Sequence, residues 1–168
     1  MCGITGFIDL KQNTSMQHLH KMTDVLHHRG PDAVGYELIE KENYWLGLGH
    51  RRLSIIDLTE SGAQPMYFQQ FWICFNGEVY NFSEIRSELE SLGHKFKSTS
   101  DTEVVLQAYV KWGSACVDRF IGMFAFVIYN SSEGKIFCCR DRAGVKPFYY
   151  YFKDGLFLFS SELKSFHE

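Results

Sequence analysis

The sequence predicts an α+β fold in which two antiparallel sheets pack face to face with helices on their outer sides, a four-layer αββα sandwich. Strand-like segments lie at both ends of the chain and helical patterns are grouped between them, unlike the alternating order of parallel sheets. Several of these strand-like segments are apolar on both faces, and aromatic residues make up 16% of the chain. Such strands need cover on both sides, which two packed sheets provide.

The first part of the chain reads as a strand, a helix and two further strands. Residues 2–10 form the first apolar run, and apolar residues three and four apart predict a helix over 15–28. The turn Arg29-Gly30-Pro31-Asp32 ends that helix, because Gly and Pro cannot continue it. Apolar runs at 34–40 and 44–49 follow, and then a loop that extends to Pro65.

The middle of the chain contains one strand and two helices. Residues 71–75 form a compact strand, which we expect to end at Asn76-Gly77. Asn81 with Glu84 predicts a capping box for a helix whose apolar stripe is Ile85, Leu89 and Leu92.

A second capping box, Ser100 with Glu103, opens the next helix, and Gly113 ends it. Asp101 then lies in the first helical turn, where the helix dipole favours a carboxylate.

The last part of the chain consists of two β-hairpins. The segments MFAFVIYN and KIFCCRD flank a polar turn at 131–134, and FYYYF and LFLFSS flank Lys153-Asp154-Gly155.

Composition excludes several classes of function. A net charge of -3 gives no basic surface for nucleic acid. No apolar stretch reaches the ~18 residues of a membrane span, and the first residues lack a secretory signal. The five cysteines have no metal-type spacing, so we expect reduced thiols in a cytoplasmic protein that binds neither nucleic acid nor membrane.

Motifs along nearly the whole chain closely resemble one family. Six of them occur in order, MCGITGF, HHRGPDAVGYE, LGHRRLSIIDL, GAQPM, FNGEVYN and SDTEV, and MFAFVIY, RDRAGVKPFYY and SSELKSF extend the match. Together they resemble the glutaminase domain of the asparagine synthetase family, a branch of the class II glutamine amidotransferases. The resemblance implies the fold of N-terminal nucleophile hydrolases and one such domain over residues 1–168.

Cys2 is the predicted nucleophile. Removal of Met1 would expose its α-amine, so that one residue carries both the thiol that attacks the side-chain amide of glutamine and the base. Taken without the motifs that follow, a cysteine after Met1 is more simply an apolar residue that opens a strand.

Asn76 and Gly77 are the predicted oxyanion donors. The Asn76 amide and the Gly77 backbone N–H would donate to the oxygen that becomes negative in the tetrahedral adduct. Glycine would also let the backbone approach the substrate closely. The structural alternative is a hairpin turn, since Asn-Gly is a strong turn signal.

The resemblance also implies a binding pocket for the glutamine zwitterion. Arg52 would bind the α-carboxylate and Asp101 the α-amine, with Glu78 beside the ligand. The alternatives are a solvated arginine and a helix-capping aspartate. The residues predicted to line the pocket by apolar or backbone contact are Leu53, Ile55 and Ile56.

Other polar residues are assigned to structural support. Arg51, and Arg29 with the turn that follows it, are expected to support the site without taking part in chemistry. His20, Asp24 and His27 could share one helix face as metal ligands, but a polar surface opposite the apolar stripe is the simpler interpretation. No metal site is expected in this domain.

The implied reaction is hydrolysis of glutamine to glutamate and ammonia. The ammonia would pass to a C-terminal synthetase domain or subunit that adenylates aspartate with ATP and magnesium. The S-G-G-x-D-S loop of that domain does not occur in this chain, so no cofactor is expected here. A homodimer, in which the partner is a second copy of the chain, is also considered.

Three alternatives remain open from the sequence. The parent protein could amidate another carboxylate, such as a sugar acid or an antibiotic precursor. Sugar-isomerising and purine-pathway amidotransferases share the cysteine and an Asn-Gly pair, but differ from GHRRLSIIDL. The chain could also be a catalytically silent binding domain, against which the joint presence of Cys2, Arg52, Asn76, Gly77 and Asp101 argues.

Overall fold

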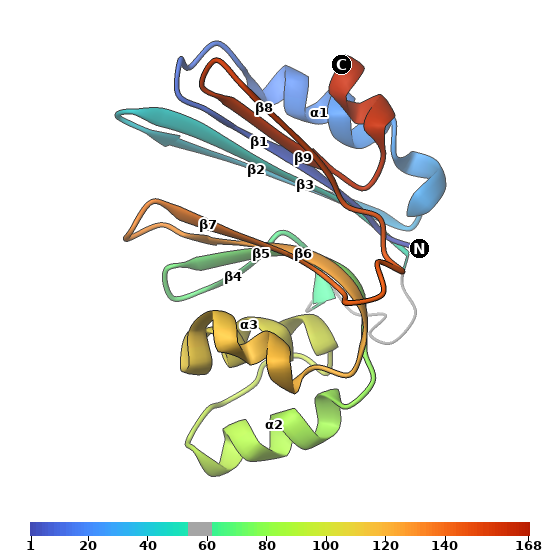
Figure 1. The fold of residues 1–168 in the computed structure, drawn as a ribbon, viewed down its shortest axis with the longest axis vertical. Helices are drawn as coiled ribbons and strands as arrows, with labels where there is room; N and C mark the ends of the chain where they lie inside the picture. The colour runs from blue at the N-terminus through green and yellow to red at the C-terminus, as the bar shows by residue number, and fades with distance from the viewer. Residues whose placement is uncertain (54–61) are drawn as a thin grey trace. The chain divides into compact units, whose positions relative to one another are not determined.

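The computed structural model describes residues 1–53 and 62–168, which belong to two compact units. One unit comprises Met1–Ser54 with Pro147–Glu168, and the other comprises Ile55–Lys146. Each unit contains one antiparallel sheet with helices packed on it (Figure 1). This confirms the predicted α+β class built on two antiparallel sheets.

The first unit is a five-stranded sheet covered on one face by a helix. The strand order is β2-β3-β1-β9-β8, and the strands are β1 (Gly3–Asp9), β2 (Ala33–Lys41), β3 (Tyr44–Arg52), β8 (Tyr149–Lys153) and β9 (Leu156–Ser160). Helix α1 (Met16–Asp24) packs on the sheet through Leu19 and Met22, which meet Phe7 in a small buried cluster. The C-terminal turn η4 (Leu163–His167) lies beside α1 (Figure 1).

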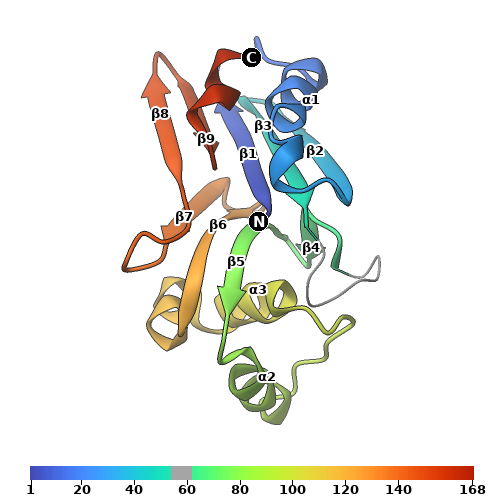
Figure 2. The same ribbon diagram turned by 90° about the vertical axis from the view of Figure 1, so that its right-hand side faces the viewer.

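The second unit is a four-stranded sheet with two helices on one side of it. Its strands lie in the order β4-β5-β6-β7 (Figure 2), and they are β4 (Met66–Phe68), β5 (Phe71–Val79), β6 (Gly122–Asn130) and β7 (Lys135–Arg140). Helix α3 (Asp101–Trp112) packs on the sheet, and α2 (Phe82–Ser91) packs on α3. One buried apolar cluster joins both helices to the inward side chains of β5 and β6.

Most predicted elements are present. The first strand, the strands over 34–40 and 44–49 and both C-terminal hairpins are confirmed. The helix predicted over 15–28 is shorter, because α1 ends at Asp24 and a separate turn, η1 (His27–Arg29), follows. A second short helix, η3 (Gly113–Arg119), leads from α3 to β6.

The predicted end of the strand at Asn76-Gly77 is wrong. Strand β5 continues to Val79, because Asn76, Gly77 and Glu78 pair with Ala125, Phe124 and Met123 of β6. A Cβ atom at Gly77 would lie 2.4 Å from the carbonyl oxygen of Met123. The glycine therefore permits close contact between two strands, and pairing with β6 overrides the local turn signal.

The two capping predictions have different outcomes. Asn81 precedes α2 but makes no side-chain cap. Its amide group instead donates to the carbonyl of Arg119 and accepts from the N–H of Ile121. Ser100 does cap α3, by accepting a hydrogen bond from the N–H of Glu103.

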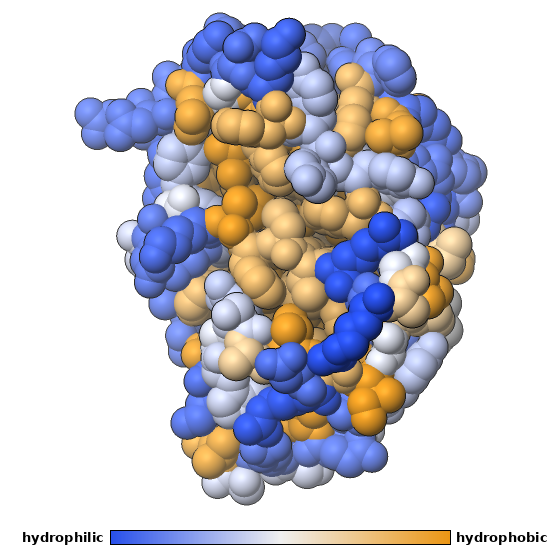
Figure 3. Space-filling model, viewed as in Figure 1, coloured by the Kyte–Doolittle hydropathy of each residue, from blue (hydrophilic) through white to orange (hydrophobic). Residues whose placement is uncertain are grey.

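Large apolar side chains are exposed at the edge of the first sheet. Tyr150 and Phe152 of β8 are 71% and 67% exposed, and Tyr149 and Tyr151 are also exposed. The space-filling view shows hydrophobic residues gathered on the face that it displays (Figure 3). Within the described part of the chain, no helix has the length and apolar character to cross a membrane.

The apolar stripe of α2 gives a test of the packing. Leu89 is fully buried, whereas Leu92, which the sequence placed on the same stripe, is 48% exposed. We expect Leu89→Ala to lower the free energy of unfolding by about 2–5 kcal/mol. Leu92→Ala, the matched control, should change it by less than about 0.5 kcal/mol. Urea denaturation measures both, and equal losses would contradict this packing of α2.

Candidate active site

The predicted site residues fall into two groups, one in each unit. The first group is Cys2, Arg52 and Leu53, and the second is Asn76, Gly77, Glu78 and Asp101. Ile55 and Ile56 lie outside the described residues. Pairing of β1 with β3 brings the first group together. In the second group, a hydrogen bond from the Val79 N–H to Asp101 joins β5 to the start of α3.

The Cys2 thiol lies against the end of β3. Strand β1 pairs with β3 on one side and with β9 on the other, and Gly3 is opposite Arg51. This register brings the Cys2 Sγ to 3.4 Å from the backbone N of Leu53 and 3.6 Å from its carbonyl O. The half-buried thiol is therefore next to Leu53, and Arg52 is the residue before it.

Arg29 holds the backbone of Cys2. Its Nε donates to the Cys2 carbonyl at 3.0 Å, and its Nη1 donates to Glu162 at 3.0 Å. His28 and Lys164 also contact that carboxylate, at 2.9 and 3.2 Å. Burial raises the pKa of Glu162, but hydrogen bonds from these three partners bring it down to about 2. Arg29 thus has the supporting position predicted for it, whereas Glu162 was not predicted.

The turn after Arg29 packs on the end of β3. A Cβ atom at Gly30 would lie 2.5 Å from the carbonyl of Arg51 and 2.6 Å from the backbone N of Arg52. Only glycine fits at this distance. The N–H of Asp32 then donates to the Arg52 carbonyl at 3.1 Å. The turn therefore fixes the backbone of Arg52, next to the thiol of Cys2.

Arg51 and the α1 carboxylate have structural roles. Arg51 forms an ion pair with Asp24 and donates to the Thr23 carbonyl. The Tyr36 hydroxyl donates to the same Asp24 oxygen at 2.7 Å, and the His20 ring lies 4.2 Å from the Tyr36 ring. Asp24 is thus committed to a network that joins α1 to the sheet. Over residues 1–53 and 62–168, no cluster of potential metal ligands is found.

In the second group, Asn76 presents an unpartnered donor. Its side chain is 1% exposed, and its Nδ2 has no hydrogen-bond partner among the residues that the structure describes. Asn76 and Glu78 lie on the face of β5 opposite Phe75 and Val79, which face the helices. An unsatisfied buried amide costs about 1–3 kcal/mol, so this position favours a ligand that accepts from it.

The backbone N–H of Gly77 points away from β6, to the edge of β5 that we call open because, among the described residues, β4 pairs with it only as far as Ile73. Phe124, its partner on β6, uses its own N–H and carbonyl for contacts with Asp141. Gly77 and Phe124 are therefore a pair without mutual hydrogen bonds. The N–H of Tyr80 points the other way, toward β6, and donates to the carbonyl of Ile121. The N–H groups of Phe75, Gly77 and Val79 thus share the edge away from β6.

Asp101 binds that same edge. Its Oδ2 accepts the N–H of Val79 at 3.1 Å, and its side chain is 6% exposed. Burial raises the pKa of Asp101, hydrogen bonds from the Val79 and Thr102 backbone lower it and Glu78 raises it slightly, and together they bring it to about 6. Because Ser100 caps α3, the carboxylate of Asp101 is not the helix cap. Two neighbouring carboxylates, one of them buried, suit a cationic group.

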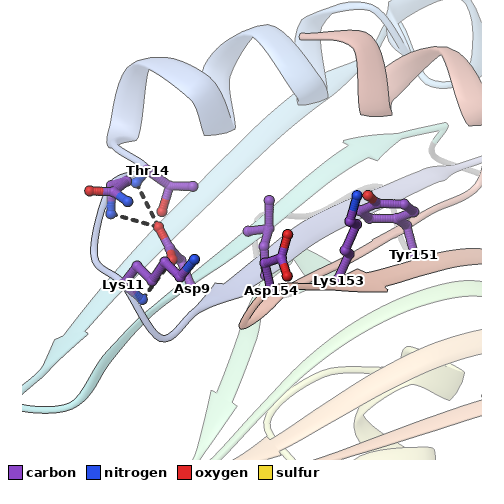
Figure 4. Close-up of a pocket in the computed structure, with 8 residues that line it drawn as sticks. Asp9, Lys11, Thr14, Tyr151, Lys153 and Asp154 are labelled. Atoms are coloured by element: carbon purple, nitrogen blue, oxygen red, sulfur yellow. Dashed lines mark hydrogen bonds between the residues drawn. The ribbon is translucent and has the colours of Figure 1, made fainter.

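A separate pocket lies at the far end of the first sheet. It is lined by residues of the β1–α1 loop and the β8–β9 hairpin, including Lys11, Tyr151 and Lys153 (Figure 4). The Asp9 carboxylate in it accepts from the N–H groups of Lys11, Asn13 and Thr14. None of the predicted site residues lines this pocket, and Asp9 serves to hold the loop.

Comparison with known proteins identifies relatives that match nearly the whole of this chain. The family model described as "Glutamine amidotransferase domain" matches residues 1–168. Asparagine synthetase [glutamine-hydrolyzing] 3 of Bacillus subtilis is 43% identical over 98% of this chain and 27% of its own length. Amidase chry2 of Gibberella zeae is 36% identical over 99% of this chain and 26% of its own. The chain spans between 26% and 34% of the first three curated relatives.

Solved structures share the fold. A glutamine phosphoribosylpyrophosphate amidotransferase from B. subtilis has a TM-score of 0.81 at 18% identity and covers 99% of this chain and 43% of its own. The structure titled as the allosteric regulatory enzyme of purine biosynthesis has a TM-score of 0.82 at 20% identity, with the same coverage. At these identities the likeness concerns the fold, and it confirms the predicted fold class.

The pKa of Asp101 predicts a pH-dependent stability. Because the folded state raises this pKa from 3.8 to about 6, the folded state binds the proton more tightly than the unfolded state. The contribution of Asp101 to stability is therefore present below pH ~4 and is lost as pH rises through ~6.

We expect Asp101→Asn to remove this loss of stability with rising pH, because the asparagine side chain does not titrate. The stability of the variant relative to wild type should rise between pH 4 and 7, by on the order of 2 kcal/mol. Urea denaturation at several pH values measures the difference, and a carboxyl NMR titration measures the pKa itself. A difference that does not change with pH would contradict the raised pKa.

Proposed function

Because the chain belongs to the family of glutamine amidotransferase domains, we propose that it hydrolyses glutamine, with Cys2 as the N-terminal nucleophile after removal of Met1. The observation that carries the proposal is the buried Asn76 Nδ2, which has no partner in the described part of the chain. Next to it, the Gly77 N–H points to the open edge of β5. Two adjacent donors of this kind suit an oxygen that gains negative charge during reaction.

The proposed reaction has two steps. The Cys2 thiol attacks the side-chain carbonyl carbon of glutamine while its α-amine takes the thiol proton. Asn76 and Gly77 stabilise the oxyanion of the adduct, and ammonia leaves with the proton that the α-amine returns. Water then attacks the thioester with the same amine as base, which releases glutamate and regenerates the thiol.

We assign recognition of the glutamine zwitterion to charges of both signs. Arg52 binds the α-carboxylate, and Asp101 with Glu78 binds the α-ammonium group. With a pKa of about 6, Asp101 is largely ionised at neutral pH, and a bound ammonium group would lower that pKa further. Leu53, Ile55 and Ile56 line the binding pocket in this proposal.

The ammonia passes, in this proposal, to a synthetase domain or subunit that uses ATP and magnesium to amidate aspartate. The names and lengths of the asparagine synthetase relatives support this assignment. Large side chains exposed on β8, among them Phe152, supply a surface that such a partner can cover. The second candidate is amidation of another carboxylate, which the similarity to the G. zeae amidase supports.

Glutamate release by the chain without Met1 is the direct test. The processed chain should produce glutamate and ammonia in equal amounts, and ATP with aspartate should change neither rate nor product. Mass spectrometry separates the processed form from the form that retains Met1. The retained form should be inactive, because its Cys2 nitrogen is an amide that cannot act as a base. Equal turnover by both forms would exclude the N-terminal mechanism.

Cys2→Ala should abolish glutamine hydrolysis while leaving the fold intact, since it removes the attacking atom. Cys138→Ala is a matched control, because Cys138 is a partly buried cysteine on β7 with no proposed role. Glutamate release and thermal unfolding should be measured on both variants. Residual activity close to wild type in Cys2→Ala, with contaminating glutaminase excluded, would refute the assignment.

Asn76→Ala should lower kcat by roughly 10²–10³, with a smaller effect on KM, because the amide acts chiefly on the transition state. Asn81→Ala is the control, since Asn81 belongs to the same unit but joins α2 to the start of β6. Steady-state kinetics at saturating glutamine separate the two parameters. An effect confined to KM would mean that Asn76 contacts only the ground state.

A further inference from the structure

We propose that Gln64 is a positioning residue for this reaction: its side chain holds the open edge of β5 against the start of α3, so that Gly77 and Asp101 keep their orientations. The inference rests on the proposed function. No role was assigned to Gln64 from the sequence, although it lies in the GAQPM motif.

Gln64 joins the two elements by two hydrogen bonds. Its Oε1 accepts the N–H of Phe75 at 2.6 Å, and its Nε2 donates to the Thr102 hydroxyl at 3.2 Å. Gln64 is 8% exposed, Phe75 2% and Thr102 4%. Phe75 precedes Asn76, and Thr102 follows Asp101. One buried carboxamide thus connects the strand of the proposed oxyanion donors to the helix that carries the proposed ammonium ligand.

The need for this side chain arises where the β4–β5 ladder stops. The two strands pair only as far as Met66 and Ile73. The outward N–H of Phe75 lies beyond the last pair, and the Gln64 side chain supplies its acceptor. The Gln64 side chain is thus a buried acceptor for β5, two residues before the start of β4.

The outward amides of β5 form a series with Gly77 in the middle. Gln64 accepts from Phe75 at one end of the series, and Asp101 accepts from Val79 at the other. Both acceptors are buried, and Gln64 also contacts Thr102, the neighbour of Asp101. Loss of the Gln64 contacts would let this edge and the first turn of α3 move apart. The Gly77 N–H and the Asp101 carboxylate would then both lose their fixed directions.

Three variants test the role. Gln64→Met keeps the length of the side chain but removes both hydrogen bonds. Thr102→Val removes only the contact with the helix, and Thr102→Ser restores the hydroxyl. Gln107→Met is the matched control, because Gln107 is a fully buried glutamine of the same unit whose hydrogen bonds go to His94, Lys95 and Glu103. Gln107→Met should lower stability while leaving kcat and KM within about twofold of wild type.

Two measurements are made on each chain after removal of Met1. Gln64→Met should lower kcat/KM for glutamine by about tenfold or more, equivalent to the loss of roughly one buried hydrogen bond. Hydrogen exchange at the Phe75 and Val79 amides should become faster. Thr102→Val should show a smaller fall in kcat/KM in the same direction, and Thr102→Ser should restore the wild-type value.

A Gln64→Met chain that loses stability as Gln107→Met does, but keeps wild-type kcat and KM, would overturn the positioning role. Unchanged exchange at Val79 would overturn it as well. A wild-type chain that releases no glutamate would instead refute the proposed function. The exchange comparison would then still decide whether Gln64 holds Val79 and Asp101 in place.

Discussion

The antiparallel pairing of β5 with β6, which continues to Val79, determines where the polar groups of the second unit point. In such a ladder each residue directs its N–H either to its partner strand or away from it. Because Phe124 uses its own backbone groups for Asp141, Gly77 must present its N–H to the opposite edge. The same alternation gives Asp101 its donor, the N–H of Val79. A shift of the register by one residue would reverse every one of these directions.

In the first unit, the corresponding constraint is the central place of β1. Strand β1 pairs with β3 from Gly3 and with β9 from Thr5, so it is held on both sides. Arg29 then binds the Cys2 carbonyl, and Glu162 binds Arg29 in turn. The residue proposed as the nucleophile is thus held by the turn after α1 and by the C-terminal part of the chain. This arrangement fixes the backbone of Cys2, while its Sγ lies against the backbone of Leu53.

The second unit retains two polar groups that are costly to bury. Asn76 has a buried donor without a partner in the described residues, and Asp101 has a carboxyl whose pKa burial raises. An apolar residue at either position would avoid that cost. Their presence, next to backbone donors that face an open strand edge, is what a site for a polar, charged ligand requires. Family membership adds the chemical identity of that ligand to the proposal.

The sequence by itself determined the class of fold, the order of most elements and the identity of the candidate residues. Periodicity reports whether one face of a segment is apolar, and it succeeded for β1, α1 and the C-terminal hairpins because their local patterns agree with their environment. The turn signal at Asn76-Gly77 was misleading, because it is local whereas the pairing of this segment with β6 is not. The capping-box signal at Asn81 was also misleading, because the Asn81 amide binds residues about forty positions further along the chain. Only the tertiary structure decided the hydrogen-bond partners of Gln64, Glu162 and Asp101, because these partners come from other elements and leave no periodic signal in the sequence.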